Sequence, residues 1–196
     1  MSGAQDRESE IGRMVVSMNA SKNKGDQAER EAAMVLNALA ADLMAGAARR
    51  KLGAGRRDDI GDLDAFVDVT IQVKAYADPV RALREAVNGA KEQANRSGTR
   101  WNVGMSPLPR ARRDGVRWIC STDVWPSAPN VHLPSFGRTS RALEYIKSAN
   151  VVIETPPRHR VALVEVKGTP TMFIGSIDAW VDALRVAYQL DLEMAG

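Results

Sequence analysis

The feature that most restricts the fold is a strand pattern followed directly by a helix pattern. Apolar and polar residues alternate in AFVDVTIQVKAY, residues 65–76, which predicts a strand with one buried face. Its predicted buried residues are Val67, Val69, Ile71 and Val73. A helix is predicted next, because Asp78 is a good N-cap, Pro79 suits the first helical position and Gly98 stops the pattern. A strand that leads into a helix favours an α/β fold.

The rest of the chain divides into segments with similar signals. A helix is predicted from Gly25 to about Met44, and further strands are predicted in residues 100–107 and 115–125. The predicted domains are an N-terminal arm at 1–20, a core at 21–126, a proline-rich linker at 127–139, and a helix-hairpin-helix extension at 140–196 packed on the core. The predicted fold class is therefore an α/β sandwich with a C-terminal α/β extension.

Composition excludes several kinds of protein. The single cysteine, Cys120, excludes an intramolecular disulfide and a cysteine-rich zinc site, and two histidines make a histidine-based metal site improbable. No apolar run is long enough for a membrane span, and the polar N-terminus MSGAQDRESE does not match a secretory signal. We therefore predict a protein of a reducing interior, with no membrane partner.

Basic residues are grouped along the chain although the net charge is only +3. Clusters of this kind suit a polyanion such as nucleic acid, and a solvated surface is the alternative interpretation. The predicted DNA-binding residues are Arg49, Arg50, Lys51, Arg56, Arg57, Arg110, Arg112 and Arg113.

Aspartates are concentrated just before the strand of residues 65–76, and this strand ends in Gln72-Val73-Lys74. Because side chains in a strand alternate with a period of two, Gln72 and Lys74 lie on one face. Hydrolysis of a phosphodiester needs a divalent metal held by oxygen ligands, a positioned water, and charge stabilisation. The pattern is consistent with this chemistry, and an ordinary exposed strand face is the alternative.

Four features resemble one family in the same order: three motifs, and after them an arginine- and alanine-rich helix followed by two strands. SKNKGDQAERE at 21–31 is similar to an opening helix in which a Lys-Gly pair precedes Glu-Arg-Glu, DDIGDL at 58–63 is similar to an aspartate element, and VTIQVK at 69–74 is similar to a strand ending in Glu-X-Lys. In these motifs residues 21–120 resemble the archaeal-type Holliday junction resolvases and their phage relatives, which belong to the PD-(D/E)XK nuclease superfamily.

The resemblance implies a restriction-endonuclease-like sandwich with a central mixed sheet and a Mg²⁺- or Mn²⁺-dependent endonuclease that acts on branched DNA as a homodimer. Carried over by motif, the catalytic residues are Lys74, Glu29, Asp62 and Gln72, and the metal ligands are Asp62, Asp59, Glu29 and Gln72. The spacing leaves Asp59 and Asp62 open as the motif aspartate, with Asp62 favoured. Glu29 lies at the edge of a buried helical stripe, where its partner is either a metal or a basic residue such as Arg30.

The sequence departs from the family at Gln72, where the motif has an acid. An amide oxygen still binds Mg²⁺, but the lost charge leaves open a non-catalytic, nuclease-fold protein of a phage particle, either structural or DNA-binding. A restriction or repair nuclease is a third possibility. A second triplet, Glu165-Val166-Lys167, has no preceding aspartate turn and is interpreted as structural. The expected location is the cytoplasm of a bacterium or infected host, or the virion under the non-catalytic alternative.

Overall fold

The computed structural model describes residues 23–51, 61–108, 116–127, 133–148 and 159–196. Within these ranges a single mixed sheet has eight strands in the order β1-β2-β3-β4-β5-β8-β7-β6. The strands are β1 (Arg49–Arg50), β2 (Leu63–Asp64), β3 (Val69–Val73), β4 (Trp101–Pro107), β5 (Trp118–Thr122), β6 (Ser135–Phe136), β7 (Val161–Val164) and β8 (Met172–Ser176). The helices are residues 23–39, α2 (Pro79–Ser97), α3 (Thr139–Lys147) and α4 (Ile177–Ala195), with a short 3-10 turn, η1, at Ala41–Leu43.

The strand-to-helix unit that the sequence predicts is confirmed in the first half of the sheet. β1, β2 and β3 pair in antiparallel fashion, and α2 then returns the chain so that β4 lies parallel to β3. The carboxylate of Asp78 accepts hydrogen bonds from the amides of Val80 (2.9 Å) and Arg81 (3.3 Å), as expected of an N-cap. Gly98 ends α2 with a left-handed φ of 71°.

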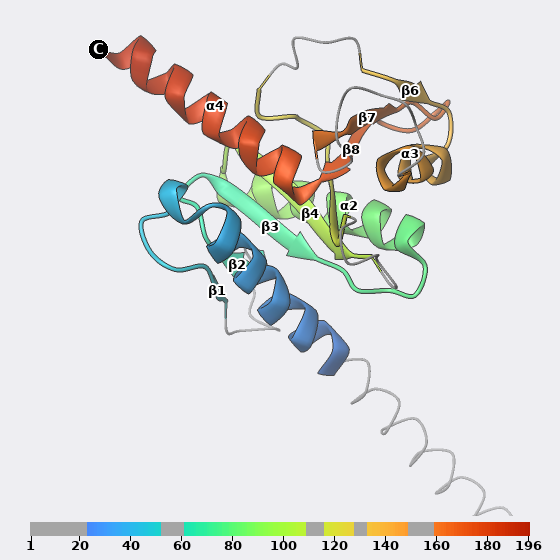
Figure 1. The fold of residues 1–196 in the computed structure, drawn as a ribbon, viewed down its shortest axis with the longest axis horizontal. Coiled ribbons are helices and arrows are strands. Elements are labelled where there is room, and N and C mark those ends of the chain that lie inside the picture. The colour runs from blue at the N-terminus through green and yellow to red at the C-terminus, as the bar shows by residue number, and fades with distance from the viewer. Residues whose placement is uncertain (1–22, 52–60, 109–115, 128–132, 149–158) are drawn as a thin grey trace, which may run out of the picture.

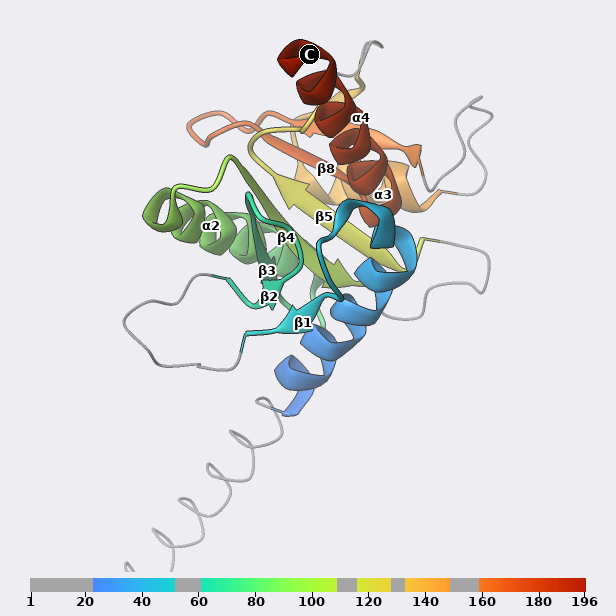
Figure 2. The same ribbon diagram turned by 90° about the vertical axis from the view of Figure 1, so that its left-hand side faces the viewer.

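The helices lie in two layers, one on each face of the sheet (Figures 1 and 2). The helix of residues 23–39 and α4 share one core with β3, β4 and β5. On the other face, α2 and α3 pack against β5, β7 and β8. The predicted mixed sheet flanked by helices is therefore confirmed.

Both faces of β3 are covered, which the sequence pattern did not predict. Val69, Ile71 and Val73 enter the first core, whereas Thr70 and Gln72 lie under α2 and are only 1% and 6% exposed. Gln72 is therefore not part of a solvated strand face. The prediction for Val67 is wrong, because it lies in the turn before β3 and is 90% exposed.

The second half of the chain continues the same sheet. β8 pairs with β5, β7 pairs with β8, and β6 pairs parallel to β7. β6 lies inside the segment predicted as a proline-rich linker, and β8 was not predicted as a strand. α3 and α4 lie close to their predicted positions, whereas residues 151–158 of the predicted hairpin and residues 1–20 of the predicted arm lie outside the described residues. Within the described ranges, no helix has the length and apolar character that a membrane crossing needs.

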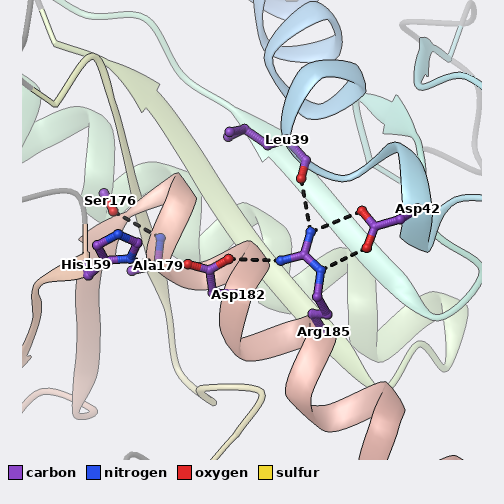
Figure 3. Close-up of polar contacts among 7 residues, drawn as sticks. All are labelled: Leu39, Asp42, His159, Ser176, Ala179, Asp182 and Arg185. Carbon is purple, nitrogen blue, oxygen red and sulfur yellow. Dashed lines mark hydrogen bonds and ion pairs between the residues drawn. The ribbon is translucent and has the colours of Figure 1, made fainter.

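A polar network joins α4 to the end of the first helix (Figure 3). The guanidinium of Arg185 donates to both carboxylate oxygens of Asp42, at 2.8 and 3.0 Å, and to the carbonyl of Leu39 at 3.2 Å. Asp182 joins Arg185 (2.9 Å) to His159 (3.2 Å). The hydrogen bonds from Arg185 lower the pKa of Asp42. The network fixes the two helices of this layer at one end.

Candidate active site

Four residues predicted to act together line one surface pocket beside the carboxyl end of β3. The pocket has a volume of about 590 Å³ and includes Glu29, Asp62, Gln72 and Lys74 in its wall. Glu29 comes from the first helix, Asp62 from the turn before β2, and Gln72 and Lys74 from the end of β3. Segments 45 positions apart in the sequence therefore converge at one end of the sheet.

The turn before β2 fixes the position of Asp62. Gly61 has a φ of 84°, and a Cβ at this position would lie only 3.0 Å from the carbonyl oxygen of Ile71, so a larger residue does not fit. The amide of Asp62 donates to that same carbonyl oxygen at 2.8 Å. Its carboxylate accepts from the backbone amide of Val73 at 2.6 Å and from Nε2 of Gln72. The carboxylate is thus held against the end of β3.

Gln72 is buried between Asp62 and helix α2. An added Cβ at Gly89 of α2 would lie 3.0 Å from Oε1 of Gln72, so the amide packs closely against the helix backbone. Nε2 donates to Asp62, which places Oε1 on the side of α2. The amide therefore supports the carboxylate of Asp62, and Oε1 would reach the same side as that carboxylate only after rotation of the amide.

Glu29 has a partner within the protein. Its Oε2 accepts from Nε of Arg50 at 2.5 Å, and the same guanidinium bonds Asp26 through Nη2 at 2.8 Å. The side chain of Arg50 is 18% exposed. Sequence reasoning offered a metal or a nearby basic residue such as Arg30. The structure instead uses an arginine from β1. Arg50, predicted as a DNA contact, is therefore committed to two carboxylates.

Of the other predicted residues, two are exposed and six lie outside the residues that the structure describes. Arg49 is exposed and lies 3.4 Å from Asp64, and Lys51 is exposed directly after β1. Asp59, Arg56, Arg57, Arg110, Arg112 and Arg113 lie outside the described residues. The structure brings Asp62 into the pocket, and Asp59 stays a prediction.

The pocket lining also includes residues that were not predicted as site residues, among them Lys24, Tyr76 and Arg81. Lys24 comes from the first helix, and Tyr76 and Arg81 come from the loop after β3 and the first turn of α2. Lys24, Lys74 and Arg81 are the three cations of the lining, which also contains the three acidic residues Glu29, Asp62 and Asp78. A sequence signal exists for Arg81, because the first turn of a helix that follows a strand lies near the carboxyl end of that strand.

The oxygen donors of the pocket suit a hard cation with few protein ligands. Mg²⁺ usually keeps several waters and takes one or two carboxylates. Asp62 offers one carboxylate, Gln72 an amide oxygen after rotation, and Glu29 a second carboxylate that is now paired with Arg50. No three His, Cys, Asp or Glu side chains of the described residues are grouped closely enough to form a metal site by themselves. The described residues that could hold such a cation are therefore Asp62 and, after rearrangement of their present contacts, Gln72 and Glu29.

Comparison with protein families, with curated proteins and with solved structures finds no match to this chain.

Proposed function

We propose that the protein is a metal-dependent DNA endonuclease with a restriction-endonuclease-like core. The observation that carries the proposal is the convergence of Glu29, Asp62, Gln72 and Lys74 on one pocket. The element order supports it, because a helix, three antiparallel strands, a helix and a parallel strand follow one another as the family resemblance implies.

Three of these four residues, Asp62, Gln72 and Lys74, have defined parts in the proposed reaction. Asp62 would hold the Mg²⁺, joined by the amide oxygen of Gln72 after rotation of its amide, and the backbone amide of Val73 keeps the carboxylate of Asp62 in place. When bound there, such a cation would supply an acidified water and charge stabilisation for the phosphate. Lys74, on the same strand as Gln72, orients the attacking water or contacts the phosphate oxygen that gains charge.

The proposal also covers how the protein contacts DNA, which DNA it prefers and its oligomeric state. In this proposal Lys24 and Lys74 are the cations of the lining that contact the phosphate backbone beside the acidic residues. Preference for a branched substrate and action as a homodimer are carried over from the resolvase resemblance.

A second candidate is a non-catalytic, nuclease-fold component of a phage particle. One observation favours it: the two carboxylates predicted as site residues have partners in the protein itself, because Arg50 neutralises Glu29 and the amide of Gln72 donates to Asp62. Carboxylates with partners of this kind do not need a bound cation, as expected of an active site that no longer catalyses a reaction.

The experiment that tests the proposal is cleavage of a labelled four-way junction with Mg²⁺, with Mn²⁺ and with EDTA. The purified full-length protein is compared with Lys74→Ala, which removes the amine from the pocket and keeps the strand. Metal-dependent cleavage by the unmodified protein alone is the expected result. DNA binding without cleavage under any metal would overturn the proposal and favour the non-catalytic candidate. Parallel reactions on linear and methylated duplexes identify a restriction or repair nuclease.

A further inference from the structure

Two side chains of the pocket lining, Tyr76 and Arg81, form a cluster with Glu85 of α2 that the proposed reaction does not use. The carboxylate of Glu85 accepts a hydrogen bond at each oxygen, from the hydroxyl of Tyr76 at Oε2 (2.6 Å) and from Nε of Arg81 at Oε1 (2.7 Å). The guanidinium carbon of Arg81 also lies 4.9 Å from the centre of the Tyr76 ring. Two contacts in different directions therefore fix the plane of this guanidinium.

The cluster leaves the terminal nitrogens of Arg81 available. Its recorded contacts within the described residues use Nε and the face of the guanidinium, and the side chain is 66% exposed. Planar terminal N–H groups match the geometry of phosphate oxygens. An arginine that is already oriented loses less conformational entropy on binding than a free one.

Arg81 lies in the same pocket as the residues proposed to act on the scissile phosphate. Tyr76 and Arg81 line the same pocket as Asp62 and Lys74. The hydrogen bonds from Tyr76 and Arg81 lower the pKa of Glu85, and the bond to Glu85 raises the pKa of Tyr76. Glu85 is thus a carboxylate and Tyr76 a neutral donor at neutral pH, so the cluster keeps one arrangement.

A second ion pair on the same helix shows what an ordinary surface pair looks like. Arg96 and Glu92 are also four residues apart, but they are 3.6 Å apart and 59% and 71% exposed. Neither lines the pocket, and no ring contact is recorded for Arg96 within the described residues. Arg96 is therefore a matched control for Arg81.

We propose that Arg81 binds a backbone phosphate of the nucleic acid next to the phosphate at Lys74, and that Glu85 and Tyr76 are positioning residues for Arg81. This inference rests on the proposed function for its substrate class. It adds a phosphate subsite to the pocket, on the α2 side of the reacting group.

The test compares Arg81→Gln and Arg96→Gln in the full-length protein. Binding of a fluorescent four-way junction is measured in EDTA over a range of salt concentrations, which requires no catalysis. Arg81→Gln should weaken binding about fivefold and reduce the slope of log K against log salt by about 1, because one phosphate contact is lost. Arg96→Gln should change neither quantity. Equal effects of the two variants on affinity and slope would overturn the subsite.

The positioning residues need a separate measurement. Tyr76→Phe removes one hydroxyl and should weaken binding two- to threefold in the unmodified background. In the Arg81→Gln background it should have no effect, because its only route to the DNA is gone. An additive effect would show that Tyr76 acts independently and would overturn the positioning role. Thermal unfolding of each variant confirms that the fold is retained.

The outcomes separate this inference from the proposed endonuclease. A reduced slope for Arg81→Gln in a protein that cleaves nothing keeps the subsite and rejects the nuclease. Cleavage that depends on Lys74 with identical behaviour of Arg81→Gln and Arg96→Gln keeps the nuclease and rejects the subsite.

Discussion

Two strands of this chain end in similar triplets with different surroundings. Gln72-Val73-Lys74 ends β3, and Glu165-Val166-Lys167 follows β7. The second triplet is closer to the Glu-X-Lys form of the nuclease motif. Only the first lines the pocket with Glu29 and Asp62.

The second triplet has the contacts of an exposed hairpin. Glu165 is exposed, and its Oε2 accepts from the hydroxyl of Ser135 at 2.5 Å. Lys167 is exposed beside Gly168, whose φ is 81°. The difference teaches that the neighbours of a short motif decide its role, because the triplet alone supplies neither the second carboxylate nor the pocket.

The largest expected difference between the triplets is in the two lysines. Lys74→Ala should reduce junction cleavage at least about a hundredfold, since it removes the positioned amine, and should leave junction binding within about threefold. Lys167→Ala should leave both within about twofold. Cleavage rates and binding affinities of the two variants are measured side by side. A collapse of binding in Lys74→Ala would make Lys74 a DNA-gripping residue instead.

The second largest difference is expected when the hydrogen-bond partner of each triplet is removed. Asp62→Ala leaves Nε2 of Gln72 and the amide of Val73 without their acceptor, which should cost about 2 kcal/mol of unfolding free energy and abolish metal-dependent cleavage. Ser135→Ala removes the partner of Glu165 at an exposed site and should cost no more than about 0.5 kcal/mol. Urea unfolding of both variants measures the difference, and similar costs would remove Asp62 from its supporting role.

Exchanging the first residues of the triplets should give a smaller effect. Gln72→Glu places a second carboxylate against Asp62, so it should destabilise the metal-free protein by on the order of 1–2 kcal/mol. The magnesium concentration for half-maximal cleavage should fall severalfold, because a ligand gains charge. Glu165→Gln should change neither quantity. An unchanged magnesium midpoint in an active Gln72→Glu protein would remove Gln72 as a ligand.

The pH dependence of the same variant has a defined sign. Repulsion by Asp62 raises the pKa of the introduced carboxyl group above its value in the unfolded chain. The penalty is therefore present at neutral pH and shrinks as the pH falls and the group binds a proton. Thermal unfolding of Gln72→Glu and the unmodified protein between about pH 7 and 5 should show the two midpoints converging. Midpoints that diverge would contradict contact between the two carboxylates.

The smallest expected effects are at one glycine near each triplet. Gly89→Ala pushes against Oε1 of Gln72, so cleavage should fall severalfold while the unfolding free energy changes by less than about 1 kcal/mol. Gly168→Ala should cost about 1 kcal/mol, because its φ of 81° suits glycine, with no change in cleavage. If Gly89→Ala lowered stability without changing cleavage, and Gly168→Ala lowered cleavage without changing stability, this account of Gln72 would be contradicted.

The parts of the fold that were predictable depend on local sequence. Asp78, Pro79 and Gly98 bound α2 as predicted, because caps act within one helical turn. β6 was missed and pairs with β7 more than twenty residues further on; β8 was missed too, and besides its hairpin partner β7 it pairs with the distant β5. β6 has two residues, too few for an alternating pattern.

Sequence reasoning grouped four residues that share one pocket, but it did not predict their contacts. The motif order named Glu29, Asp62, Gln72 and Lys74, and the structure places all four in one pocket. The pairing of Glu29 with Arg50 joins residues 21 positions apart through the packing of β1 on the first helix, which no local pattern encodes. The orientation of the Gln72 amide is set by its contacts with both Asp62 and Gly89, which no local pattern encodes either.

The pairing of β5 with β8 has a consequence for synthesis of the protein. Every described pocket residue precedes α3, but the strand that covers the edge of β5 begins only at Met172, fifty positions after Thr122. At about 5–20 residues per second a ribosome needs several seconds to make that interval, during which the hydrogen-bonding edge of β5 stays open to other chains. We expect nascent chains stalled before Met172 to aggregate, although the segment that carries the pocket is already complete.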